Sequence, residues 1–369
     1  MAITWTEAMH LAGTLVPPGP KISRARARAV VSVVESNTET VSKLVATITG
    51  LPASVTENLN IVAVDRSRWI YRAGRTLQNL IDPAPATQVV KSTVNPLRGL
   101  AVSAMMGLSA LRVYGHCDPT VPGEPIYLSV PNLVQTRRFK SLDAIDFSQW
   151  IALRSAVYCA QFRAAPWIVE YIRARVDLLM RSVEADDIGD ISLSGLWNTV
   201  RNADSLAADA EDNSTLVLRT RRARGYTRRT ESGDTVELSP QEIAAAGPTD
   251  PIAALTELTE LFGFMDAYMR VSMEYLTPTQ ITSIQRIRAL MRGTPTPGSL
   301  LLRAFTRGLG FDPVTWNPSS LRRFIRQVRS EEGAQVLNRV FTSPENLPTR
   351  TELANPSQWV RRMEHNPVS

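Results

Sequence analysis

The sequence predicts a mainly α-helical protein with a small β component. Apolar residues recur at helical spacing along most of the chain, while the alternation that is typical of strands is confined to short stretches. Of the 369 residues, 44% are hydrophobic and 21% are charged, as in a soluble globular protein with ample core. No apolar run approaches the roughly 20 residues of a membrane-spanning helix, so we expect no membrane span.

The first eighty residues are predicted to be helical around one short strand. An amphipathic helix begins near Trp5, and residues 21–50 form two helices or one kinked helix that ends at Gly50. The β-branched run in NIVAV precedes Asp65, a residue suited to the N-cap of a helix over 66–81.

The next hundred residues are predicted to contain a buried helix, a strand and two more helices. The buried helix covers 95–113. The stretch PIYLSVPNL at 125–133 is the clearest strand, because its apolar residues alternate between two prolines. Helices over 146–163 and 166–183 follow.

The composition changes between residues 184 and 250, where acidic and basic blocks surround a turn signal in ESGDTVELSP. We interpret this stretch as an inserted, partly mobile region with a small hairpin. The chain is therefore expected to consist of a zincin-like N-terminal part at 1–183, the insertion at 184–250, and a helical part at 251–369 that packs on the first. In the last part, helices are predicted at 251–275, 278–292, 298–308, 318–329, 331–341 and 355–363.

The charge balance is mildly basic, with a net charge of +6 from 41 basic and 35 acidic residues, so a nucleic-acid partner is not expected. One run, RTRRARGYTRR, sets cations beside an aromatic ring, as a phosphate or single-stranded nucleic-acid surface would require. The favoured interpretation is a solvated loop whose charge is balanced by the neighbouring acidic stretches. The arginines of this run are Arg219, Arg221, Arg222, Arg224, Arg228 and Arg229.

Cysteine and histidine are scarce, with two and three residues respectively. Two cysteines form no disulfide framework and the N-terminus resembles no signal peptide, so the sequence predicts a reducing, cytoplasmic setting. His116 and Cys117 are adjacent, but neighbours in a loop rarely bind the same ion and no second pair of ligands follows. We therefore expect them to pack in a loop.

The helix over 146–163 carries Arg154, Ser155 and Tyr158 where an ordinary buried helix would carry aliphatic residues. Positions 154 and 158 are four apart and share one helix face. The same spacing relates the two zinc-binding histidines of an H-E-x-x-H motif, in which the glutamate is the general base. Taken alone, however, the pattern is equally an Arg–Tyr pair on a helix surface.

The sequence on both sides of positions 154–158 resembles that of a known family. The chain resembles an actinobacterial family of zincin-like metallopeptidases, whose members are described variously as uncharacterised, coenzyme F420 biosynthesis-associated or hydrolase proteins. The resemblance implies a mostly helical, zincin-like fold in which the strand near 126–130 borders the active-site helix. The segments that carry it are VDRSRWI at 64–70, VYGHCDP at 113–119, YLSVPNLV at 127–134, DFSQWIALRSAVYCAQFRAAPWIVEY at 146–171 and VLNRVFTSPENLPTRTELANPSQWVRRM at 336–363.

The resemblance also implies where the family's zinc site would lie, and here the sequence departs from the pattern. Aligned without a gap, the first zinc histidine falls on Arg154, the general-base glutamate on Ser155 and the second histidine on Tyr158. A downstream E-G-H motif, matched to LFGFMDAYM, falls on Phe262 and Phe264.

These replacements exclude the family's metal chemistry. Arginine stays protonated and would repel zinc, serine is no carboxylate base, and phenylalanine has no donor atom. We therefore expect no zinc and no other cofactor. Our hypothesis is that Arg154 stands roughly where the zinc ion would lie, stacked on Tyr158 or a phenylalanine and paired with Asp143 or Asp146.

The sequence thus predicts a catalytically inactive homologue, a pseudopeptidase that binds a protein or peptide, with β-strand addition near 126–130 as one mode. The alternative is a hydrolase of a different, non-zinc mechanism in the same cleft that uses Ser155 or Cys159. A third possibility is a phosphate or nucleic-acid binder acting through the 219–229 arginines.

Overall fold

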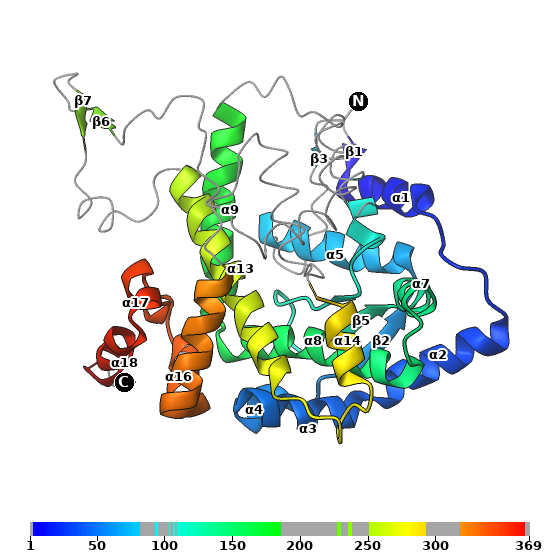
Figure 1. Ribbon diagram of the computed structural model, residues 1–369. Helices are drawn as coiled ribbons and strands as arrows, with labels where there is room; N and C mark the ends of the chain where they lie inside the picture. Colours follow the sequence, from blue (N-terminus) through cyan, green and yellow to red (C-terminus); the bar gives the residue numbers. More distant parts are fainter. Residues whose placement is uncertain are drawn as a thin grey trace.

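The structure, a computed structural model, describes residues 3–81, 93–94, 103, 106–107, 109–185, 227–229, 235–237, 251–292 and 318–365. These residues form many packed helices and a small three-stranded sheet, which confirms the predicted fold class (Figure 1). The elements are β1 (Ile3–Thr4), α1 (Trp5–Leu15), α2 (Arg24–Ser36), α3 (Thr38–Thr49), α4 (Ala53–Thr56), β2 (Ile61–Val64), α5 (Arg66–Ile81), β3 (Thr93–Val94), β4 (Gly115–His116), β5 (Ile126–Ser129), α7 (Val130–Lys140), α8 (Ala144–Ala164), α9 (Trp167–Ala185), β6 (Thr227–Arg229), β7 (Thr235–Glu237), α13 (Pro251–Glu274), α14 (Ile284–Leu290), α16 (Pro318–Asn338), the 3₁₀ turns η1 (Arg339–Phe341) and η2 (Pro344–Asn346), α17 (Arg350–Ala354) and α18 (Pro356–His365).

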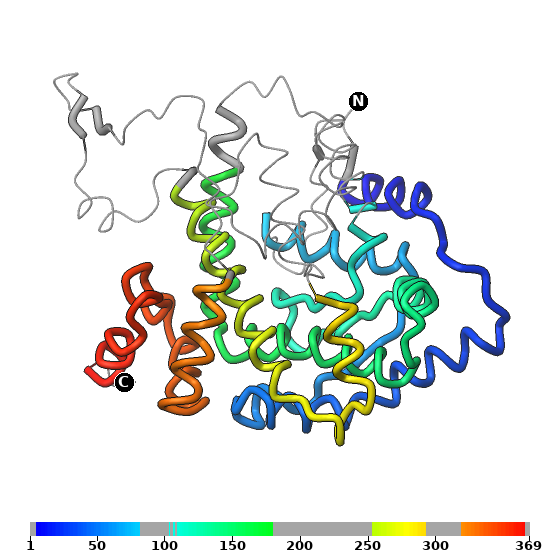
Figure 2. Tube along the Cα trace, in the orientation of Figure 1, coloured from blue at the N-terminus to red at the C-terminus, as the bar shows by residue number. Residues whose placement is uncertain are grey.

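Helix α8 is the central element. It contacts α2, α3, α4, α7, α13, α14 and the strands β4 and β5. Figure 2 traces the path of the chain through these elements in the orientation of Figure 1. Most of its side chains are buried, on all sides of the helix, which is the pattern of a helix inside a large core. Asp143 starts it by accepting hydrogen bonds from the backbone N–H groups of Ile145 and Asp146.

The three-stranded sheet separates two hydrophobic cores. Strand β5 lies in the middle, parallel to β2 and antiparallel to β4. Because successive side chains of a strand point to opposite faces, Ile126 and Leu128 join the core around α8, while Tyr127 joins the smaller core of α1 and α5. The sheet therefore holds β4 and β5 directly beside α8, as the resemblance implies.

The position of β5 overturns the idea that a peptide adds to the strand near 126–130. Both of its edges are already paired, with β2 along its full length and with β4 at Tyr127 and Leu128. The strand is also shorter than the predicted 125–133, because α7 begins at Val130 with Pro131 in its first turn.

The predicted helices near the N-terminus are confirmed. Residues 21–50 form the two helices α2 and α3, which meet at Asn37. Gly50 ends α3 with a left-handed φ of 66°, and an added Cβ there would lie 2.6 Å from the Cβ of Ala334 on α16. Asp65 caps α5 by accepting from the N–H of Arg68 at 2.7 Å.

The C-terminal helices pack on the N-terminal ones. Helix α13 lies along α8 and α9, α16 lies on α13, and α17 and α18 cover α16. The hydroxyl of Tyr268 on α13 donates to the backbone oxygen of Thr49 at 3.2 Å and to the side chain of Asn338 at 2.7 Å. Trp167 on α9 donates to the backbone oxygen of Phe341 at 2.8 Å. These bonds join α3, α9, α13 and the end of α16.

Other boundaries differ in detail. The helix predicted at 278–292 covers only Ile284–Leu290, and the break predicted near 330 falls at Gly333, where φ is 88° within α16. In the predicted insertion, β6 and β7 form the expected antiparallel hairpin. Residues 186–226, 230–234 and 238–250, the helix at 298–308 and much of 95–113 lie outside the described residues. Within the described part, no helix is both long and apolar enough to cross a bilayer.

Candidate functional site

Arg154 lies inside the protein on α8, with 9% of the residue exposed. Its guanidinium carbon is 4.8 Å from the ring centroid of Trp150, one helical turn earlier. The aromatic partner of the arginine is therefore Trp150, whereas the sequence hypothesis named Tyr158 or a phenylalanine. A guanidinium over an indole face is a favourable cation–π contact.

Burial, together with the positive charge of Arg270, lowers the pKa of Arg154 to about 10. The carboxylate of Asp266 opposes both effects. Because a pKa of about 10 is still far above neutral pH, Arg154 carries its positive charge inside the fold.

Asp143 and Asp146, which we expected to pair with Arg154, are engaged elsewhere. Asp143 caps α8, and Asp146 accepts from the backbone N–H of Ser283, just before α14, at 2.7 Å. The carboxylate whose charge acts on Arg154 is instead that of Asp266, from α13.

Asp266 joins α8 to α13. One of its oxygens accepts from the Tyr158 hydroxyl at 3.2 Å, and the other accepts from Nε of Arg270, one turn along α13, at 2.8 Å. The side chains of Asp266 and Arg270 are 21% and 25% exposed. We call Arg154, Tyr158, Asp266 and Arg270 the Asp266 cluster; two of the positions aligned with the family's motif helix belong to it.

The two phenylalanines aligned with the downstream motif behave differently. Phe264 is buried and packs on Tyr268, at 6.4 Å between ring centroids. Phe262 is partly buried and lies one turn before Asp266, so the two share a helix face. Of the two aligned positions, 262 is therefore the one on the face of the Asp266 cluster.

Ser155 is held against the sheet. Its hydroxyl donates to the backbone oxygen of Ile151 at 3.1 Å, and a Cβ added at Gly115 would lie 2.0 Å from its Oγ. His116, the residue after Gly115, points elsewhere. Its imidazole shares a hydrogen bond of 2.9 Å with the hydroxyl of Thr76 on α5. Because Gly115 and His116 present opposite faces of β4, this histidine is not placed to act as a base for Ser155.

His116 and Cys117 therefore have separate surroundings, consistent with packing roles. Cys117 meets Cys159 of α8, toward which its thiol is the hydrogen-bond donor. Sequence reasoning missed this pair because 42 positions separate the two residues and no motif connects them.

The residues of the site do not fit a zinc ion. No group of three His, Cys, Asp or Glu side chains that could hold a metal occurs in the part of the chain that the structure describes. At the aligned positions stand a guanidinium, a hydroxyl and a phenol, of which the first is a permanent cation.

The arginine run can be placed only in part. Arg228 and Arg229 belong to strand β6. Their side chains and the other four arginines of the run lie outside the described residues.

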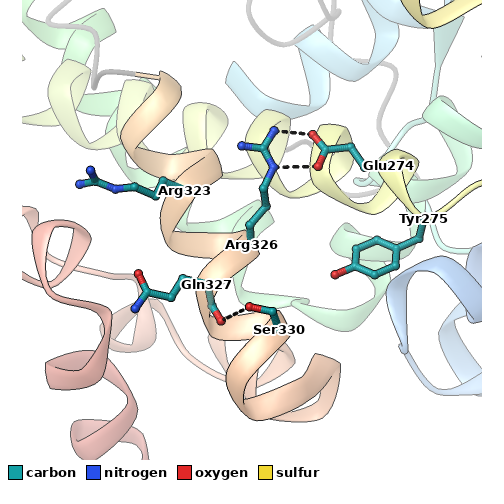
Figure 3. Close-up of a pocket in the computed structure, with 6 residues that line it drawn as sticks. All are labelled: Glu274, Tyr275, Arg323, Arg326, Gln327 and Ser330. Carbon is teal, nitrogen blue, oxygen red and sulfur yellow. Dashed lines mark hydrogen bonds and ion pairs between the residues drawn. The ribbon is translucent and has the colours of Figure 1, made fainter. Parts of the chain in front are cut away.

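A surface groove lies farther along α13, away from the Asp266 cluster. In it Arg326 of α16 pairs with Glu274 through two bonds of 2.7 and 2.5 Å (Figure 3). Tyr275, Arg323, Gln327 and Ser330 complete the lining. Glu274 is two turns beyond Asp266 on the same helix, which makes the pair a useful reference for the cluster.

Comparisons with known proteins agree with this architecture. A family model described as a zincin-like metallopeptidase matches residues 3–360. The fold is similar to that of a protein from Chloroflexus aurantiacus described as a "putative hydrolase with a novel fold", with a TM-score of 0.62, 20% sequence identity, and coverage of 99% of this chain and 100% of that one. No curated protein sequence matches the chain. The chain thus belongs to the zincin-like metallopeptidase family.

Proposed function

We propose that this protein is a pseudopeptidase: a member of the zincin-like metallopeptidase family that has lost the zinc site and acts by binding a protein or peptide. The observation that carries the proposal is Arg154, a buried and charged arginine at the position aligned with the first zinc histidine. Near neutral pH Arg154 carries its positive charge, and a cation at this position would repel zinc.

The replacements support one another. Arg154 brings a positive charge, Asp266 supplies the compensating negative charge from α13, and Tyr158 and Arg270 hydrogen-bond to that carboxylate. The cluster therefore uses its polar groups to join two helices, and a substitution that restored one zinc ligand at 154 or 158 would remove one of its members.

The binding surface that we propose is the exposed side of the Asp266 cluster. Asp266 and Arg270 are partly exposed, so they offer an acceptor and donors to the amide groups of a peptide. The described strands support this choice, since β5 is paired on both edges and the N–H of Ala63 on β2 donates to Glu35 of α2.

The loss of zinc is tested by metal analysis and proteolysis on the full chain. After incubation with zinc and dialysis, the protein should retain much less than one zinc per chain, and it should not cleave a casein substrate. A zinc peptidase treated identically is the positive control. One zinc per chain, or cleavage that a chelator abolishes, would overturn the proposal. Labelling of Ser155 by a fluorophosphonate, or of Cys159 by a peptide-like electrophile with turnover, would favour the alternative hydrolase.

Peptide binding is tested by selection from a displayed random-peptide library. Enriched peptides should bind the wild-type protein and bind D266N/R270Q at least tenfold more weakly. The matched control is E274Q/R326Q, which removes the ion pair between Glu274 at the end of α13 and Arg326 of α16 without touching the cluster. Circular dichroism checks that both variants are folded. Absence of enrichment, or equal loss in both variants, would refute this surface.

A further inference from the structure

The only two cysteines of the chain lie on neighbouring elements, Cys117 directly after β4 and Cys159 on helix α8, which β4 contacts. We propose that Cys117 and Cys159 are a redox-active pair that forms a reversible intramolecular disulfide on reaction with hydrogen peroxide. This site lies outside the Asp266 cluster and does not depend on the proposed binding function.

The backbone geometry sets the two residues together. An added Cβ on Gly115 would lie 3.0 Å from the Cβ of Ser155, so strand β4 passes directly over α8 there. Cys117 is the first residue after β4 and packs against the hydrophobic core that contains Cys159. Cys159 lies four residues, about one helical turn, along α8 from Ser155.

The pKa shifts of the two thiols agree with this placement. Cys117 acts as hydrogen-bond donor toward Cys159, which raises the pKa of Cys117 and lowers that of Cys159. Arg163, one turn further along α8, also lowers the pKa of Cys159 by its charge. Its guanidinium is held in place by the backbone oxygens of Glu57 and Asn58, at 2.7 and 3.3 Å.

This asymmetry assigns the roles in the reaction. The thiolate of Cys159 attacks one oxygen of the peroxide, an S–O bond forms, the O–O bond breaks, and hydroxide leaves and takes up a proton as water. The sulfur of Cys117, losing its proton, then attacks the sulfenic acid, the S–S bond forms and a second water leaves. Two electrons from two thiols thus reduce one peroxide to two waters.

Access restricts the oxidant to a small molecule. Cys159 is 6% exposed, whereas Cys117 is partly exposed at the loop. The disulfide would fix the loop after β4 to α8 one residue from Tyr158. No other cysteine competes, because the chain has only these two.

The experiment treats the reduced full-length protein with hydrogen peroxide at micromolar protein concentration and then alkylates it under denaturing conditions. We expect the free thiols to fall from two to none, with a mass lower by two hydrogen atoms. Trypsin should then yield peptides 113–137 and 155–163 joined to one another. Dithiothreitol should restore both thiols.

Single variants assign the order of attack. In C117S the sulfenic acid of Cys159 should persist and be trapped by dimedone, while in C159S the reaction of Cys117 should be at least tenfold slower. Circular dichroism at each stage checks that the fold persists. The proposal is overturned if both thiols stay alkylatable after excess peroxide while the protein remains folded, or if the product is a disulfide-linked dimer.

Discussion

Arg154 is charged at neutral pH although it lies between α8 and α13, and its neighbours explain how the fold accommodates it. The guanidinium of Arg154 makes a cation–π contact with the ring of Trp150. The carboxylate of Asp266 compensates part of the positive charge of Arg154 and Arg270. Removing one charged member of such a group lowers the free energy of unfolding by more than the whole group contributes to it, because the remaining charges stay buried without compensation.

We predict that D266N destabilises the protein. The asparagine keeps the size of the side chain but leaves Arg154 and Arg270 facing each other without a negative charge. Since Asp266 is 21% exposed, solvent reduces the loss below that of a fully buried pair, and we expect about 2 kcal/mol in the free energy of unfolding. Urea denaturation at pH 7 measures it.

A double-mutant cycle provides the control for this prediction. In an R154M background, D266N should cost about half as much, because one of the two uncompensated charges is gone. The exposed pair at Glu274 is the reference, and E274Q should cost less than about 0.5 kcal/mol. An equal cost of D266N with and without Arg154 would show that the two charges are not coupled.

At the scale of elements, β4 is held to α5 by one buried histidine. His116 contacts the Trp69 ring edge-on at 6.1 Å between centroids, and its Nε2 shares the hydrogen bond with Thr76. Burial lowers the pKa of His116 to about 4, against the opposing effects of Asp118 and Glu124. The imidazole is therefore neutral when β4 is docked.

This predicts that the contact between β4 and α5 weakens in mild acid. In the unfolded chain His116 takes up a proton near pH 6.5, while in the folded protein it does so only near pH 4. The unfolded state therefore binds more protons between these values, and stability falls as the pH drops. From pH 7.5 to pH 5 the loss should be about 2 kcal/mol.

The variant H116Q isolates this effect from the titration of carboxylates. Glutamine can still hydrogen-bond to Thr76 but has no proton to gain. The difference in free energy of unfolding between wild type and H116Q should shrink by about 2 kcal/mol over the same range, in favour of the variant at low pH. A difference that does not change with pH would mean that His116 titrates normally in the folded protein.

The sequence predicted those elements whose signals are local. Asp65 and Gly50 marked helix ends correctly because a cap bonds to its own chain neighbours. The end of β5 was misplaced because alternation continued through Pro131, which starts α7 instead. The helix at 278–292 was too long, because the side chain of Gln280 accepts from the N–H of Thr277 and stabilises a turn.

The candidate site, too, could be predicted only where its signals are local in the sequence. The helix that carries Arg154 was predicted from its own sequence and flanks. Its partners could not be predicted, since Asp266 is more than a hundred positions away and nothing in either segment marks the contact. The contact with Trp150 could have been predicted, because a spacing of four residues places Trp150 and Arg154 on one helix face.

At the scale of the whole molecule, the parts before and after the predicted insertion share one core. Helix α13 packs on α8 and α9, and Tyr268 and Trp167 bond across the boundary between these parts. The buried side chains of α8 and α13 belong to a single hydrophobic cluster. Packing of this extent favours a single cooperative unit.

We predict from this that a cut within 184–250 leaves the protein assembled. Brief trypsin treatment should cleave after the arginines at 219–229, giving two fragments. Because the contacts of α13 with α8 and α9 do not depend on a covalent link, the fragments should co-elute from gel filtration in native buffer and separate in denaturing urea. The nicked protein should also melt in one transition, by circular dichroism and by tryptophan fluorescence. Fragments that part in native buffer, or two separate transitions, would show instead that 1–183 and 251–369 are independent domains.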